Sequence, residues 1–195
     1  MDVNRTLVLV KHSAPVLERA VAPKNWRLSE EGRRRSVVLA DRLERHGVRL
    51  VFCSEEPKAV ETAEIVAERL GVGCSVRARL HEHDRTGAPF LSDEGFDLAA
   101  RTFFASPDKL VWGNETAEQA LERFDGAVRA VLETRNEEVV AVVAHGTVIS
   151  LFVAQYNDVE AYELWRKLGL PSFSILSVPE FGLRRSTYNL RPGSS

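Results

Sequence analysis

The chain has 195 residues, of which 44% are hydrophobic, and this is enough to form one domain with a full apolar core. Its formal net charge of −2 provides no overall positive field, so we expect neither nucleic acid nor an acidic membrane surface as a partner. The two cysteines form no paired zinc motif, and we expect no metal and no cofactor. The N-terminus lacks a secretion signal and no apolar stretch is long enough to span a bilayer, so we expect a cytoplasmic protein.

Strand and helix patterns alternate along the first half of the chain. The continuous apolar run Thr6–Val10 is typical of a strand that is buried on both faces, as in a parallel sheet. A helix follows from the N-cap Ser29 to about Arg45. The next elements are a strand at Val48–Cys53, a helix at Pro57–Leu70 with Gly71 past its end, and a weaker strand at Cys74–Ala78.

The second half begins with an irregular stretch and then resumes the alternation. Residues 81–114 are irregular, with a helix near Asp93–Phe104, and Thr116 to Gln119 form a capping box that opens a helix to about Thr134. The remaining elements are a strand at Glu138–Ala144, helices at Gly146–Gln155 and Val159–Leu168, strands at Phe173–Val178 and Leu183–Tyr188, and a frayed tail over 191–195. This order predicts an α/β fold over 1–195, a single domain in which a three-layer α/β/α sandwich holds a mostly parallel central sheet.

Polar residues directly follow the buried strands, and ligands of open α/β sheets bind beyond the carboxyl ends of the strands. The candidates there are Lys11, His12 and Ser13 after the first strand, Lys58 in the first turn of the helix after the second, and His145 and Gly146 after the strand at 138–144. One strand-end histidine is most often an ordinary surface residue. Two histidines with two lysines and two helix N-termini at one edge favour a phosphate site.

Six segments in order resemble the histidine phosphatase superfamily, the phosphoglycerate-mutase-like proteins. They are Lys11-His12-Ser13 for Arg-His-Gly, Trp26 to Gly32 for Leu-Thr-x-x-Gly, Cys53 to Ala63 for Ser-Ser-Pro-x-x-Arg-Ala-x-Gln-Thr-Ala, Leu80-His81-Glu82 for Leu-x-Glu, Gly113 to Ala117 for Gly-x-Glu-Ser, and Val142 to Gly146 for the second histidine segment. The resemblance covers residues 7 to about 150.

The resemblance implies a phosphoglycerate-mutase-like fold and a metal-independent phosphatase for a small phosphorylated substrate. His12 would be the nucleophile that forms a phosphohistidine, Glu82 the general acid and base, and His145 a third catalytic residue. The phosphate-binding residues would be Lys11, Lys58, Ser13, Gly146 and Arg85. Both arginines of the family are lysines here, which keeps the charge and loses the bidentate fork, and Arg85 or Arg27 could restore one guanidinium.

Three other functions stay open at this point. A mutase would use the same nucleophile, although mutases of this family are longer than this chain. A metal-dependent hydrolase would recruit ligands from His81, Glu82, His83, His12 and His145, although their spacing matches no standard motif. A non-catalytic phosphate-binding protein would explain the lysine replacements.

Several residues have two interpretations. Ser54 either supports a turn near the phosphate or caps the following helix, and Glu115 either binds a charged partner or complements a helix N-terminus. If their segment is extended, His81 and His83 point together, opposite to Glu82. The insert at about 81–114 either covers the substrate with its aromatic residues or packs as ordinary structure; these are Phe90, Phe96, Phe103, Phe104 and Trp112. The apolar residues between Tyr162 and Phe173 either form a homodimer contact or cover the sheet edge.

Overall fold

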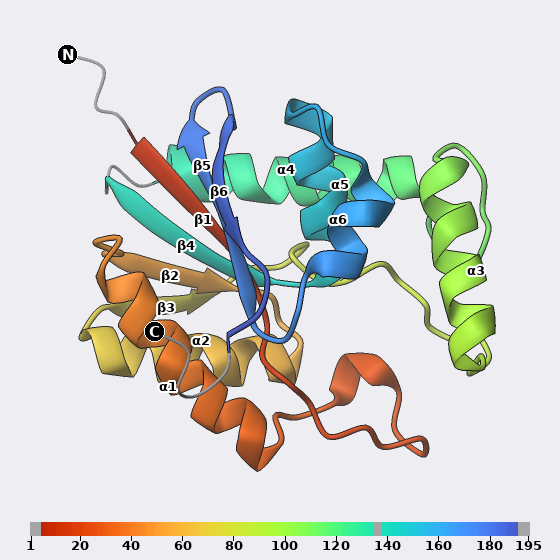
Figure 1. The fold of residues 1–195 in the computed structure, drawn as a ribbon, viewed down its shortest axis with the longest axis horizontal. Coiled ribbons are helices and arrows are strands. Elements are labelled where there is room, and N and C mark those ends of the chain that lie inside the picture. Colours follow the sequence, from red (N-terminus) through yellow and green to blue (C-terminus); the bar gives the residue numbers. More distant parts are fainter. Residues whose placement is uncertain (1–4, 135–137, 191–195) are drawn as a thin grey trace.

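The computed structural model describes residues 5–134 and 138–190, which form one six-stranded sheet between two layers of helices (Figure 1). The strands are β1 (Arg5–Lys11), β2 (Leu50–Cys53), β3 (Gly73–Val76), β4 (Val139–Ala144), β5 (Ser172–Val178) and β6 (Leu183–Thr187). Their order across the sheet is β3-β2-β4-β1-β5-β6. The first four are parallel to one another, and β5 and β6 add an antiparallel edge. The mostly parallel sheet predicted from the sequence is therefore confirmed.

The helices cover both faces of this sheet. They are α1 (Glu30–Glu44), α2 (Pro57–Leu70), α3 (Asp93–Ala105), α4 (Ala117–Glu133), α5 (Gly146–Tyr156) and α6 (Ala161–Lys167), with a short 3-10 turn at Pro23–Asn25 that the sequence did not predict. α1 and α2 lie on one face, and α4, α5 and α6 lie on the other (Figure 1). α3, from the insert, stands beside α6 at one end of the molecule. The three-layer arrangement is as predicted.

Two hydrophobic cores follow from the alternation of side chains along the central strands. Leu7 and Leu9 of β1 point into the core beneath α4 and α5, whereas Val8 and Val10 point into the core beneath α1 and α2. All four side chains are completely buried. Helices on both faces thus account for the unbroken apolar run in this strand.

Local signals place the helix ends close to where the sequence predicted them. The Ser29 hydroxyl accepts a hydrogen bond from the Gly32 amide at the start of α1, and the capping box of Thr116 and Gln119 is formed at the start of α4. Gly71 ends α2 with a φ of 65°, in the left-handed region that favours glycine. The tail at 191–195 lies outside the described residues. Within the described ranges, no helix is long and apolar enough to cross a membrane.

Most of the apolar residues around α6 pack inside the chain. Tyr162, Leu164, Leu168 and Phe173 are all buried, and the Tyr162 hydroxyl donates to Asp97 Oδ1 of α3 at 2.6 Å. These side chains hold α3 and the sheet edge in place and do not offer a surface to a second copy. The homodimer stays a prediction.

Candidate active site

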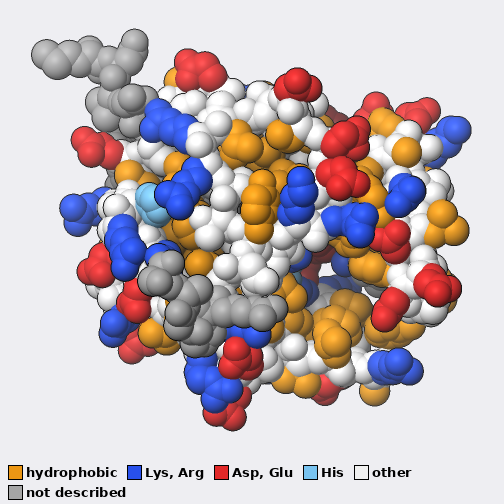
Figure 2. Space-filling view, viewed as in Figure 1, with side chains coloured by type: hydrophobic (Ala, Val, Ile, Leu, Met, Phe, Trp, Pro, Cys, Tyr) orange, Lys and Arg blue, Asp and Glu red, His pale blue; other side chains and the backbone are white. Residues whose placement is uncertain are grey.

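A cavity of about 510 Å³ opens at the carboxyl ends of β1 and β4. Because these two strands are parallel neighbours, the residues that follow them meet at the same edge of the sheet. Figure 2 shows the cavity as a hollow bordered by hydrophobic side chains, with charged side chains visible inside it. The structure brings together seven of the predicted site residues in its lining, namely Lys11, His12, Lys58, Glu82, Arg85, His145 and Gly146.

His12 directly follows β1, and its backbone continues the ladder by donating to the Ala144 carbonyl at 3.0 Å. Its Nδ1 lies 2.7 Å from the Ser13 carbonyl oxygen. A carbonyl only accepts, so Nδ1 carries the proton and Nε2 keeps its lone pair. Burial, followed by the nearby charges of His145 and Lys58, lowers the pKa of His12 well below its ordinary value. The ring is therefore neutral at neutral pH, as a nitrogen nucleophile must be.

His145 lies beside His12, with 5.1 Å between the two ring centroids. Its Nε2 is 2.9 Å from the Ser54 hydroxyl, and its buried Nδ1 has no hydrogen-bond partner among the described residues. Burial and the charge of Lys58 lower its pKa well below the ordinary value. The Ser54 hydroxyl also accepts the Glu56 amide hydrogen bond at 3.2 Å, so Ser54 holds a turn of the site and orients His145, and it does not cap α2.

The two lysines reach the cavity from different elements, Lys11 from the end of β1 and Lys58 from the first turn of α2. Lys11 donates to the Leu168 carbonyl at 2.7 Å, and burial lowers its pKa to about 8 despite the opposing charge of Glu82. Lys58 donates to the Pro23 carbonyl at 2.8 Å and also to the carboxylate of Glu56. Both ammonium groups are thus held by the protein while still lining the cavity.

Glu56 is a site residue that the sequence did not reveal. It is buried, lines the cavity, and forms an ion pair with Lys58. Its Oε1 accepts the Glu82 amide hydrogen bond at 2.9 Å and lies 3.6 Å from His145 Nε2. A glutamate before a helix-starting proline has the same pattern as an exposed first-turn acid, so no local signal distinguishes it.

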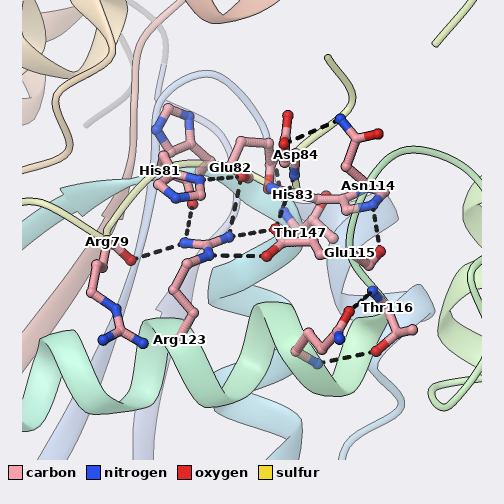
Figure 3. Close-up of polar contacts among 12 residues, drawn as sticks. Arg79, His81, Glu82, His83, Asp84, Asn114, Glu115, Thr116, Arg123 and Thr147 are labelled. Atoms are coloured by element: carbon pink, nitrogen blue, oxygen red, sulfur yellow. Dashed lines mark hydrogen bonds and ion pairs between the residues drawn. The ribbon is translucent and has the colours of Figure 1, made fainter. Parts of the chain in front are cut away.

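Glu82 places its carboxylate in the cavity through two backbone hydrogen bonds (Figure 3). Its Oε1 accepts from the His83 amide at 2.9 Å, and its Oε2 accepts from the Thr147 amide in the first turn of α5 at 3.2 Å. Burial raises its pKa, but the charges of His145 and Arg85 and these two amides outweigh burial and bring the pKa to about 2. In the empty site the carboxylate is ionised.

Arg123 of α4 holds the segment that carries Glu82 (Figure 3). Its guanidinium donates to the carbonyls of Arg79 and His81 at 2.9 Å each and of Glu82 at 3.2 Å. The same group forms two hydrogen bonds with the Glu115 carboxylate, at 2.6 and 3.0 Å. Glu115 therefore binds a cation within the chain, so neither interpretation from the sequence describes its role in full.

Two residues considered as phosphate contacts, Ser13 and Arg27, take other positions, and Arg85 lies where it was expected. The Ser13 hydroxyl donates to the Gly32 carbonyl at 2.7 Å and its amide donates to Thr62, so Ser13 secures the loop and does not line the cavity. Arg27 is exposed and pairs with Glu61, away from the lining. Arg85 does line the cavity, and its guanidinium lies 4.9 Å from the centroid of the Trp112 ring.

The insert contributes both packing and cavity lining. Phe90 and Phe96 line the cavity, whereas Phe103 is buried against His83, with 4.2 Å between ring centroids. His83 Nε2 lies 3.1 Å from the Glu115 carbonyl, while His81 Nδ1 lies 2.9 Å from the Glu82 carbonyl. Of the two flanking histidines only His83 reaches the cavity. Within the described part of the chain, no three His, Cys, Asp or Glu side chains group as metal ligands.

Fold and site together define an α/β protein with a cavity lined by two imidazoles and two lysines at the carboxyl edge of its sheet. The chain belongs to the histidine phosphatase superfamily (branch 1), whose pattern matches residues 7–190. One curated relative is the probable phosphoglycerate mutase GpmB of Cronobacter sakazakii, 28% identical over 156 residues that cover 77% of this chain and 72% of that protein.

Solved structures share the fold over nearly the whole chain. Bacillus stearothermophilus YhfR superposes with a TM-score of 0.74 at 23% identity, over 98% of each chain. A mycobacterial glucosyl-3-phosphoglycerate phosphatase in complex with inorganic phosphate superposes with a TM-score of 0.73 at 23% identity, over 97% of this chain and 98% of that one. The predicted phosphoglycerate-mutase-like fold is thereby confirmed.

Proposed function

We propose that this protein is a phosphatase that hydrolyses a small phosphomonoester through a phosphohistidine on His12. The observation that carries the proposal is the hydrogen bond between His12 Nδ1 and the Ser13 carbonyl at 2.7 Å. It leaves a neutral ring with a free Nε2 in a cavity that also holds Lys11, Lys58 and His145. Cations and an imidazole around a nucleophile are what an in-line displacement at phosphorus requires.

In the first step, His12 Nε2 attacks phosphorus and the bond to the ester oxygen breaks. Lys11, Lys58 and His145 surround the other phosphate oxygens and stabilise the charge on them. Glu82 gives a proton to the departing alkoxide. The pKa of Glu82 is about 2 in the empty site, and a dianionic phosphate beside it raises that pKa, so the carboxyl can carry the proton once substrate is bound.

In the second step, Glu82 removes a proton from water as the water attacks the phosphohistidine. The P–N bond breaks, inorganic phosphate forms, and His12 regains its lone pair. The ionised carboxylate left by the first step is the base that the second step needs, so one residue serves both. Apart from the substrate and this water, the proposed steps use only side chains that line the cavity.

The test compares 4-nitrophenyl phosphate hydrolysis by the wild type and by His12→Ala. We expect turnover by the wild type and a loss of more than a thousandfold in the variant, since the nucleophile is gone. The matched control is His46→Ala, because His46 packs against Phe173 away from the cavity and its loss should leave turnover intact. Activity that survives His12→Ala would refute the phosphohistidine, and trapping of labelled phosphate on His12 after rapid denaturation would support it.

A mutase is the second candidate, because the curated relatives carry the name probable phosphoglycerate mutase. It would return the phosphoryl group from His12 to a second oxygen of the substrate. Phosphoglycerate interconversion that depends on a bisphosphate primer, and exceeds hydrolysis, would favour the mutase. Phosphate binding without any turnover would favour a non-catalytic protein, and loss of turnover in excess chelator would favour the metal-dependent alternative. The cytoplasmic location and the absence of nucleic-acid and membrane partners stay predictions.

A further inference from the structure

The mouth of the cavity is far more apolar than a phosphate group needs. A volume of about 510 Å³ falls within the range of roughly 300–1,000 Å³ that is typical of sites for whole organic ligands. Above the charged floor, the walls come from the segment before α1, from the insert and from α6. The apolar side chains there include Leu17, Trp26, Phe90, Phe96, Trp165 and Leu170.

Two of these side chains have little packing role in the chain itself. Leu17 is 73% exposed and Phe90 is 57% exposed. Isolated exposed apolar side chains are common on protein surfaces. Leu17 and Phe90, however, border the same cavity together with two partly buried tryptophans. Figure 2 shows the same arrangement, with hydrophobic side chains around the hollow.

The charged side chains of the mouth are already engaged within the chain. Lys24 donates to the Thr86 hydroxyl at 3.2 Å, and Asp84 accepts from the Thr86 amide at 2.9 Å. Arg85 lies over the ring of Trp112. These contacts take up part of the polar capacity of the mouth, whereas an apolar group would gain burial against its apolar side chains without disturbing any of them.

We propose that the cavity selects phosphomonoesters whose leaving group is a flat apolar moiety, such as an aromatic alcohol. This inference rests on the proposed function and narrows its substrate class. The phosphate would lie on the floor between Lys11 and Lys58, and the apolar group would lie in the mouth against Phe90 and Phe96. Small polar esters would fill the floor alone and leave the mouth in water.

The test uses three esters of primary alcohols, so that leaving-group chemistry stays similar: 2-phenylethyl phosphate, ethyl phosphate and glycerol 3-phosphate. We expect kcat/KM for 2-phenylethyl phosphate to exceed that for the other two by roughly tenfold or more, because a ring is buried only there. Equal values, or a preference for glycerol 3-phosphate, would overturn the inference while leaving the phosphatase proposal intact.

Variants of the mouth provide the second arm. The measured quantity is kcat/KM for 2-phenylethyl phosphate divided by kcat/KM for ethyl phosphate. Leu17→Ser and Phe90→Ser should each lower this ratio by roughly threefold or more. Leu98→Ser is the matched control, because Leu98 is 65% exposed on α3 and does not line the cavity. An unchanged ratio in both mouth variants would overturn the inference. If no ester is hydrolysed, the proposed function fails. The inference is then tested by calorimetry, in which 2-phenylethylphosphonate should bind roughly tenfold more tightly than ethylphosphonate. Equal affinities would overturn it.

A separate observation concerns Glu56, whose negative charge faces a site for anions. Its carboxylate forms an ion pair with Lys58, both side chains being more than nine-tenths buried. Lys58 stands at a position where the family resemblance places one of the two phosphate-binding arginines. Its three donor hydrogens are thus divided between the Pro23 carbonyl, Glu56 and the cavity.

We infer that Glu56 competes with the phosphate group for Lys58 and so weakens the binding of phosphate. A phosphate near Lys58 meets the like charge of Glu56, which also accepts the Glu82 amide hydrogen bond. This inference likewise rests on the proposed function. Weaker binding of the inorganic phosphate that hydrolysis leaves behind would speed its release and limit product inhibition.

The experiment measures the dissociation constant of inorganic phosphate by calorimetry, which needs no turnover. Glu56→Gln keeps an acceptor for the Glu82 amide and removes the charge, and we expect phosphate to bind roughly tenfold more tightly. Glu55→Gln is the matched control, since the neighbouring Glu55 is exposed and the charge change is the same. Unchanged or weaker binding in Glu56→Gln would overturn the inference. Circular dichroism verifies folding, and Glu56→Gln combined with Lys58→Gln should abolish the gain if Lys58 mediates it.

Discussion

A Cβ atom on Gly146 would lie 3.1 Å from Cε and 3.2 Å from Nζ of Lys11. Gly146 lacks a side chain and therefore leaves room for the ammonium group of Lys11. This close approach joins the carboxyl ends of β1 and β4, and it gives Gly146 a steric role at the floor of the cavity.

Gly146→Ala should push the end of Lys11 aside by a few tenths of an ångström. We expect kcat/KM for a phosphomonoester to fall about tenfold, since small displacements of a positioned charge are costly in catalysis. Stability should hold or rise by about 0.4–1 kcal/mol, because alanine restricts the unfolded chain more than glycine does. The measurements are steady-state kinetics and the Tm. Gly126→Ala in α4, where a Cβ meets nothing within 4 Å, is the control, and equal activities of the two variants would refute this role.

The alkaline limb of the pH profile should report Lys11, whose pKa is lowered to about 8 by burial. A lysine is charged below its pKa, so the free enzyme keeps this ammonium in roughly nine-tenths of molecules at pH 7 and in roughly one-tenth at pH 9. The substrate is already dianionic over this range. We therefore expect kcat/KM to decline through about pH 8. In Lys11→Arg the limb should move to higher pH, because arginine does not lose its proton; a limb that stays near pH 8 would assign it to another group.

Glu82→Gln tests the proton donor through the leaving group. Hydrolysis of an alkyl ester such as ethyl phosphate should slow by roughly a hundredfold or more, because the alkoxide needs a proton to depart. Hydrolysis of 4-nitrophenyl phosphate should slow much less in the phosphorylation step, since nitrophenolate is stable without one. The rate of the first burst of nitrophenolate isolates that step. Equal losses for both esters would show that Glu82 does not act as the acid.

Arg123→Lys should disturb Glu82 from a distance. Lysine cannot reach three carbonyls and the Glu115 carboxylate together, so we expect a loss of about 2–3 kcal/mol in the free energy of unfolding, measured in urea. If the hydrogen bonds of Arg123 position Glu82, kcat should fall more for ethyl phosphate than for 4-nitrophenyl phosphate. Arg129→Lys on the same helix is the control, because Arg129 pairs with Asp125 and Asp125 does not line the cavity. Equal effects on both esters would reduce Arg123 to a structural role.

The fold was predictable because its signals are local. Each signal acts over one helical turn or one strand. The apolar run predicted β1, the capping box at Thr116 predicted the start of α4, and Pro57 and Gly71 predicted the two ends of α2; the structure has these elements. The strand at 74–78 proved to be Gly73–Val76, and the helix at 159–168 proved to be Ala161–Lys167. Ends without a cap or a glycine stop are the least determined by sequence.

The candidate site was predictable where it depends on strand ends. His12 and His145 each follow a buried strand, and the parallel pairing of β1 with β4 brings their rings together. Ser13 and Arg27 lie outside the cavity lining, because the polar groups of Ser13 bond to Gly32 and Thr62 and the guanidinium of Arg27 pairs with Glu61.

By itself the sequence determined the alternation of strands and helices, the two cores and the edge of the sheet at which the histidines meet. These features follow from apolar periodicity and from the geometry of parallel strands, and both are properties of short segments. Only the tertiary structure decided that Glu56 pairs with Lys58, that Arg123 holds the Glu82 segment and that Gly146 makes room for Lys11. Two of these contacts join residues that are far apart along the chain, and the third depends on how the turn before α2 orients the Glu56 side chain. In each case the packing of the whole molecule selects the partner, and a local sequence pattern does not.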